Sequence, residues 1–220
     1  MKKVILLVFL SLLFINAEAV PDWKLKKETS TLKIFTATIN NSDYKAVKVE
    51  CTVTGNFSQV IAALFDIDRQ QEWVYSDKHS KLLKKVSNSE LIYYSEVSVP
   101  WPATNRDFIS HLTVTQPSIN IVNIESHAEA NFIPEKDGIV RIKNSTSHWT
   151  ISSLGNNQLR IDYTIQFEPG GSVPVWLTNM FITKGPFETF DKLQERVKMP
   201  AYRNASFDFI KNCNSFVSTQ

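Results

Sequence analysis

The sequence predicts an α+β fold in which a curved antiparallel sheet wraps around a long C-terminal helix and encloses a cavity. Three patterns predict it. Apolar residues alternate with period two from residue 79 to residue 168, helical spacing follows Ser58, and a long apolar helical run follows Ser172. Hydrophobic residues are 43% and charged residues 21% of the 220 residues, as in an ordinary folded domain.

The first nineteen residues are predicted to be a signal peptide rather than part of the fold. A positive start, an apolar stretch over 4–15 and the small-residue pattern Ala17-Glu18-Ala19 follow in the order typical of secretion signals. The apolar stretch is too short for a membrane span of about 20 residues. We therefore expect a secreted or periplasmic protein with a domain over 20–200 and a C-terminal tail over 201–220.

The domain is predicted to begin with strands and one helix. The strand segments are 23–27, 32–39 and 44–53. After the break at Gly55-Asn56, apolar residues recur at three- and four-residue spacing from Val60 to Ile67, which predicts an amphipathic helix. A short irregular turn is expected over 71–74.

The alternating region predicts antiparallel strands with one buried face. In its last strand Leu159, Ile161 and Tyr163 alternate with polar residues such as Arg160 and Asp162. The breaks between strands fall at 88–89, 117–118, 135–138 and 155–157, where turn-forming residues gather. Such short spacing favours a meander.

The last element is predicted to be a long, apolar helix. Pro169-Gly170-Gly171 ends the last strand, and Ser172 is a suitable N-cap. The apolar pattern runs to Val197, with an interruption expected at Gly185-Pro186, and Pro200 ends the helix.

A sheet with one apolar face must be covered, and this helix is long enough to do so. The inward positions are apolar with a few hydroxyls, including Tyr93, Ser110 and Tyr163, as expected of a ligand pocket. A solid core whose hydroxyls bond to the backbone fits the same pattern. An interior smaller than roughly 300 Å³ would favour an interaction domain without a ligand.

Composition and motifs exclude several other functions. A net charge of +2 is far from that of nucleic-acid-binding domains, and no phosphate-binding glycine loop is present. The four histidines have no metal-ligand spacing, so no metal or cofactor is expected. His111 and His127 nevertheless fall on the polar faces of neighbouring strands and could approach each other. Cys51 and Cys213 are either a disulfide or two isolated thiols.

Several motifs, in order, resemble those of the START family, the steroidogenic-acute-regulatory-protein-related lipid-transfer domains. They are Trp23-Lys24-Leu25, Phe65-Asp66-Ile67, Trp73, Tyr94, Pro100-Trp101-Pro102, Arg106-Asp107-Phe108, Val140-Arg141-Ile142, Trp149, Glu168 to Pro174, Trp176 and Asn179. The resemblance implies a helix-grip fold with a tunnel for one lipid. Family members carry sterols, phospholipids, ceramides or carotenoids between membranes and have no catalytic residues.

The resemblance implies that this chain is a monomeric lipid-binding or lipid-transfer protein, not an enzyme, that contacts membranes transiently. A polyketide cyclase or aromatase using the same cavity is the alternative. Sterol-carrying members place a buried acid and a buried arginine where this chain has Tyr93 and Leu112, which disfavours that mode of sterol recognition. The predicted ligand-binding residues are Tyr93, Phe108, Ser110, Leu112, Val122, Ile124, Tyr163, Ile165, Met180 and Phe187.

Two motifs have two interpretations each. Arg106 and Asp107 are expected to form a structural ion pair at the start of a strand, and a contact with a lipid head group is the alternative. Trp101, on a loop stiffened by two prolines, either docks on a membrane surface or packs under the edge of the sheet.

Overall fold

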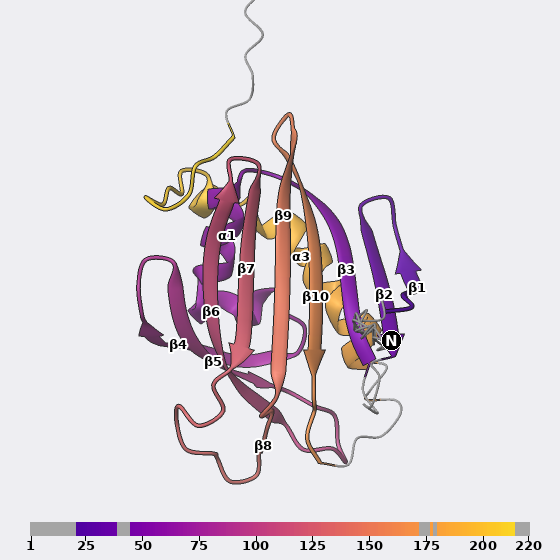
Figure 1. The fold of residues 1–220 in the computed structure, drawn as a ribbon. Coiled ribbons are helices and arrows are strands. Elements are labelled where there is room, and N and C mark those ends of the chain that lie inside the picture. The colour runs from indigo at the N-terminus through magenta and orange to yellow at the C-terminus, as the bar shows by residue number, and fades with distance from the viewer. Residues whose placement is uncertain (1–20, 39–44, 172–176, 178–179, 214–220) are drawn as a thin grey trace, which may run out of the picture.

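In the computed structural model, ten strands form one curved sheet with helices on one face (Figure 1). The structure describes residues 21–38, 45–171, 177 and 180–213, with the backbone but not the side chain of Met180. The predicted signal peptide, the turn at 40–43 and the predicted helix start at Ser172 lie outside the described residues.

The sheet is built in two parts. β1 (Lys24–Glu28), β2 (Leu32–Thr38) and β3 (Lys45–Thr54) are successive antiparallel strands at one edge. The remaining strands are β4 (Asp77–Lys85), β5 (Glu90–Val97), β6 (Arg106–Ser118), β7 (Ile121–Ala128), β8 (Val140–Arg141), β9 (Ser145–Gly155) and β10 (Gln158–Phe167). The spatial order β1-β2-β3-β10-β9-β7-β6-β5-β4 means that the chain crosses from β3 to the far edge and then returns strand by strand.

The antiparallel meander predicted for the alternating region is therefore correct except at β8. This two-residue strand pairs with β6 in parallel, and Ile133 of the segment before it packs on the outer face of the sheet. The other turns lie where the sequence places them, except that the break predicted at 117–118 falls at 119–120, because β6 continues to Ser118. Between β9 and β10, Asn156 and Asn157 have positive φ of 48° and 57°, which favours a tight hairpin.

The crossing from β3 to β4 is made by α1 (Phe57–Phe65) and the 3₁₀ helix η1 (Ile67–Glu72). The Asn56 side chain accepts a hydrogen bond from the Gln59 N–H, and the Gln59 side chain accepts one from the Asn56 N–H. This capping box starts the helix one residue before Ser58. The turn expected over 71–74 is largely the end of η1, since Gln70 to Glu72 continue it.

The described part of the C-terminal helix consists of the π-helical turn η2 (Met180–Lys184) and α3 (Gly185–Arg196), followed by the 3₁₀ helix η3 (Pro200–Tyr202). The junction between η2 and α3 falls at Gly185-Pro186, where the sequence predicts an interruption. Proline lacks the N–H that would continue the helical ladder, which explains the change of helix type.

Alternation along the strands produces two apolar clusters on opposite faces. The larger lies between the inner face of the sheet, α1 and α3, and includes Val49, Ile124, Ile161 and Phe190. A smaller cluster of Ile92, Tyr94 and Ile109, with Leu83 and Ile133 packed against it, lies on the outer face.

Both cysteines are free thiols. Cys51 is buried in β3, while the Cys213 thiol donates to the Ile119 carbonyl at 2.9 Å, in the turn between β6 and β7. Of the two alternatives left open by the sequence, the structure therefore contains the isolated thiols.

Candidate functional site

A cavity of about 250 Å³ lies between the inner face of the sheet and the helices. Its wall comes from β5, β6, β7, β9 and β10, and from α1, η1, η2 and α3. The lining is mostly apolar and aromatic, and includes Leu64, Trp73, Val97, Phe108, Leu112, Trp149, Ile165, Phe167, Phe181 and Phe190. This volume is below the range of about 300–1,000 Å³ of small-molecule pockets. By that measure, the interior in this conformation agrees with the interaction-domain interpretation.

Six of the ten predicted ligand-binding residues line this cavity: Tyr93, Phe108, Ser110, Leu112, Tyr163 and Ile165. Val122 and Ile124 do not, because they lie farther along β7, where both are 0% exposed within the solid core. Phe187 packs against the core outside the wall, and the Lys27 Nζ lies 3.3 Å from the centroid of its ring. The side chain of Met180 is not described.

One end of the cavity is closed by three aromatic rings that belong to the wall. The ring centroids of Trp149 and Tyr163 are 4.6 Å apart, and Phe190 of α3 lies 5.1 Å from Trp149 and 5.2 Å from Tyr163. Trp149 and Tyr163 are direct cross-strand partners on β9 and β10. The predicted site omitted Trp149 and Phe190. Strand parity could have placed Trp149 inward, but no sequence pattern indicates which turn of α3 faces it.

Hydroxyl groups lie in the middle of the wall. Ser110 and Ser126, on neighbouring strands, are hydrogen-bonded to each other, and Ser145 and Ser147 continue the row on β9. Burial raises the pKa of Tyr93 to about 12, while its hydrogen bond with Ser110 works in the opposite direction. The phenol therefore stays neutral and is able to donate or accept a hydrogen bond.

A buried acid lies behind this row, between η1 and β5. Asp77 accepts hydrogen bonds from the Ser80 hydroxyl and, at 3.2 Å, from the Ser95 hydroxyl. Burial raises the pKa of Asp77. Alternation also places Ser95 inward. Its hydroxyl is hydrogen-bonded to Asp77, and the residue is absent from the cavity wall.

Arg106 is a charged group on the cavity wall, at the end opposite the aromatic rings. The residue is 3% exposed, and its guanidinium donates to the carbonyls of Thr104, of Pro169 at 3.5 Å and of Gly170 at 3.4 Å. Burial lowers its pKa, and among the described residues no carboxylate pairs with it.

The predicted ion pair between Arg106 and Asp107 is wrong. Neighbouring residues of a strand point to opposite faces, so Asp107 lies on the outer face. There it accepts hydrogen bonds from Arg141, at 2.6 Å from Nε and 3.1 Å from Nη2. Arg106 is left facing the interior without that partner.

Trp101 is 90% exposed, so it does not pack under the sheet edge. It lies on the loop between β5 and β6, where the Ala103 N–H donates to the Pro100 carbonyl. Arg106 bonds to Thr104 of this loop and to Gly170, which follows β10. The exposed indole and the arginine end of the cavity therefore lie at the same end of the sheet.

A curved sheet closed by a C-terminal helix over an apolar cavity defines the helix-grip class of α+β proteins. The START domain model matches residues 14–201, which is most of the chain. The chain belongs to the START domain family.

Two relatives illustrate the similarity in sequence. An uncharacterized protein of Pseudomonas aeruginosa is 29% identical over 173 residues, which span 79% of this chain and 85% of that protein. The phosphatidylcholine transfer protein of mouse is 29% identical over 171 residues, which span 74% of this chain and 78% of that protein.

Solved structures show the same fold. A STAR-related lipid transfer protein of Xanthomonas axonopodis superposes with a TM-score of 0.74 at 26% identity, covering 80% of this chain and 99% of that one. Human STARD10 superposes with a TM-score of 0.69 at 18% identity, covering 82% of this chain and 74% of that one.

Proposed function

We propose that this protein binds one lipid molecule in the space between the sheet and α3, and carries it between membranes as a monomer. The observation that supports the proposal most is the apolar cavity with a central row of hydroxyls, in a chain of this family. Relatives named as phosphatidylcholine transfer proteins favour the same function. Burying acyl chains contributes about 0.8 kcal/mol per methylene, so the apolar wall supplies most of the affinity.

The lining favours binding over catalysis. A cyclase or aromatase would need several acid–base groups around its reactive chain, whereas the described lining residues include Arg106 and hydroxyl groups but no histidine or carboxylate. The Arg106 guanidinium is held by backbone carbonyls, which positions it to contact a ligand rather than to transfer protons.

We further propose that Arg106 contacts a phosphate of the bound lipid. A buried guanidinium without a carboxylate partner gains most from an anion that completes its hydrogen bonds. Such charge-assisted hydrogen bonds contribute about 1.5–3 kcal/mol. The alternative interpretation of Arg106, as a head-group contact, is therefore the one that the geometry supports.

A whole phospholipid requires this interior to expand. The present volume of about 250 Å³ is below the range of small-molecule pockets and too little for two acyl chains. We propose that the helix moves at the junction of η2 and α3, at Gly185-Pro186, to admit the lipid. Trp101, 90% exposed near the arginine end, would insert into the membrane surface during loading, because indole favours that interface.

We also propose that the chain is exported, since residues 1–19 have the order of a cleaved secretion signal. No helix of the described part is both long and apolar enough to cross a membrane. Terminal sequencing of the protein isolated from its host should find Val20 first. A chain recovered with residues 1–19 intact would contradict export by cleavage.

The binding proposal is tested by native mass spectrometry after incubation with vesicles that contain phosphatidylcholine, phosphatidylglycerol, diacylglycerol or cholesterol. We expect one phospholipid per chain, and at least tenfold weaker retention of diacylglycerol with the same acyl chains, because it lacks the phosphate. Equal retention of diacylglycerol would contradict the role of Arg106. No uptake of any of these lipids would contradict the function itself.

Matched variants separate the cavity from the surface. Ala128 lines the cavity, and Glu125 lies on the outer face of the same strand. The variants Ala128→Phe and Glu125→Phe therefore add the same phenyl ring to opposite faces of the sheet. We expect Ala128→Phe to abolish uptake and Glu125→Phe to leave it unchanged. Equal uptake by both variants would place the lipid elsewhere.

A further inference from the structure

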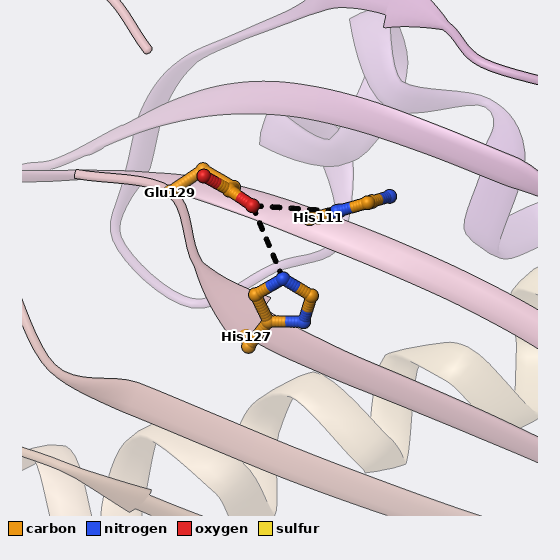
Figure 2. A group of neighbouring side chains, drawn as sticks. All are labelled: His111, His127 and Glu129. Atoms are coloured by element: carbon orange, nitrogen blue, oxygen red, sulfur yellow. Dashed lines mark hydrogen bonds and ion pairs between the residues drawn. The ribbon is translucent and has the colours of Figure 1, made fainter. Parts of the chain in front are cut away.

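Three side chains with metal-binding atoms meet on the outer face of the sheet, away from the cavity (Figure 2). His111 of β6 and His127 of β7 are direct cross-strand partners, and their ring centroids are 4.8 Å apart. Glu129 follows His127 by two residues, so its side chain points to the same face. Its N–H donates to the Ile109 carbonyl at 2.9 Å, which holds the backbone beside β6.

The two distances from Glu129 to the histidine nitrogens match those between ligands of a tetrahedral metal ion. Glu129 Oε1 lies 3.2 Å from His127 Nε2 and 3.5 Å from His111 Nδ1. All three ligand atoms lie within 4.8 Å of one another. Two ligands that bind Zn²⁺ at about 2.0–2.1 Å in tetrahedral geometry are about 3.3 Å apart. Small side-chain rotations would therefore bring all three atoms to bonding distance of one ion.

A fourth residue determines which nitrogen of His111 is available. Glu90 Oε1 lies 2.5 Å from His111 Nε2, so this nitrogen carries the hydrogen and donates it to the carboxylate. In the neutral ring, the lone pair of Nδ1 then faces the carboxylate of Glu129. That lone pair is the atom through which His111 is able to bind a metal ion together with Glu129.

The same contact is the usual support of a metal-bound histidine. Such histidines donate their other ring N–H to a carboxylate or carbonyl, which fixes the ring and increases its basicity as a ligand. The side chains of His127 and Glu129 are 52% and 40% exposed, so the site opens to solvent and leaves a fourth position for water. Two imidazoles and one carboxylate suit Zn²⁺ rather than Mg²⁺ or Ca²⁺.

We propose that His111, His127 and Glu129 bind one Zn²⁺ ion on the outer face of the sheet, with Glu90 as the residue that positions His111. The ion joins the end of β7 to β6. It thereby fastens the beginning of the segment over 129–139, whose far end is held by the bond between Arg141 and Asp107.

Isothermal titration of ZnCl₂ into the tag-free protein, in excess Mg²⁺, tests the proposal. We expect one Zn²⁺ per chain in the wild type and at least tenfold weaker binding in His127→Asn. His148→Asn is the matched control. His148 lies on the same face but outside the group of His111, His127 and Glu129, with its Nδ1 3.7 Å from Glu125 Oε1. No binding by the wild type, or equal binding by His127→Asn, would overturn the site.

Two further measurements keep the proposal falsifiable if one variant folds poorly. Glu90→Gln should weaken Zn²⁺ binding about 10–100-fold without abolishing it. Zn²⁺ should also raise the thermal midpoint of the wild type and of His148→Asn but not that of His127→Asn. Unchanged affinity in Glu90→Gln would refute its positioning role, and a rise of equal size in His127→Asn would place the ion elsewhere.

Discussion

Strand alternation places the neighbouring charged residues Arg106 and Asp107 on opposite faces of the sheet. Arg106 and Asp107 are adjacent in sequence, yet one faces the cavity and the other is buried under the segment that precedes β8. Asp107 binds Arg141, whose remaining N–H groups donate to the carbonyls of Ala130, Ile133 and Pro134. The hydrogen bonds that Arg141 donates to Asp107 raise the pKa of Arg141, so its guanidinium stays charged.

Breaking the buried pair should destabilise the fold strongly. Asp107→Asn leaves the Arg141 guanidinium, whose side chain is 0% exposed, without its counter-charge, and we expect a loss of about 3–5 kcal/mol in the free energy of unfolding. Urea denaturation monitored by circular dichroism measures it.

The exposed pair of Arg160 and Asp162 is the matched control. It also has two hydrogen bonds, at 2.8 and 2.9 Å, but its side chains are 48% and 36% exposed. Asp162→Asn should cost less than about 1 kcal/mol. Similar losses in the two variants would show that burial of the Asp107–Arg141 pair does not determine its contribution.

At the scale of elements, α3 is tied to η1 by a charged cluster. Arg196 donates to Glu72 at 2.5 Å and to Asp66 at 3.3 Å, and the Tyr202 hydroxyl donates to Asp66 at 2.6 Å. These bonds fasten the C-terminal end of α3, whereas the movement proposed above lies at its other end, at Gly185-Pro186.

This connection should weaken in acid. Hydrogen bonds from Arg69 and Arg196 lower the pKa of Glu72 from 4.5 to about 2. Because its pKa is lower in the folded state, the stability that ionised Glu72 contributes is full above about pH 4.5 and disappears as the pH falls towards 2. Chemical denaturation at pH 7, 4 and 2.5 measures the free energy of unfolding of the wild type and of Glu72→Gln. The difference between the two should become smaller at each lower pH. A difference that is constant or that grows in acid would refute this role.

The sequence predicts the elements well, because alternation and helical spacing are local properties. Parity correctly places Phe108, Leu112 and Tyr163 on the inner face. Parity does not indicate where along a strand a cavity ends, which explains the wrong placement of Val122 and Ile124. That boundary depends on α1 and on Phe190, which meet β7 and β9 only through the tertiary fold. The partner of Asp107 was likewise missed, because Arg141 lies 34 residues away.

At the scale of the whole molecule, the arginine end of the cavity and the exposed indole of Trp101 lie together. This arrangement predicts that Trp101 acts in membrane contact rather than in lipid affinity. Trp101→Ala should slow phospholipid transfer between vesicles several-fold, because the indole no longer enters the interface. A fluorescent transfer assay measures the rate.

The affinity of Trp101→Ala for a short-chain phospholipid below its micelle concentration should stay unchanged, since Trp101 is absent from the cavity wall. Leu154→Ala, which removes an exposed apolar side chain at the hairpin between β9 and β10, is the control and should transfer at the wild-type rate. A loss of affinity in Trp101→Ala, or equal slowing in both variants, would contradict the docking role.

The central claim is that a lipid, rather than more protein, fills the space between the sheet and α3. Loading the protein with a phospholipid that carries a photoactivatable group in one acyl chain, followed by peptide mapping, tests it most directly. We predict cross-links to wall residues such as Phe108, Ser126 and Trp149 on three separate strands. Cross-links confined to the outer face or to the Trp101 loop would contradict the claim.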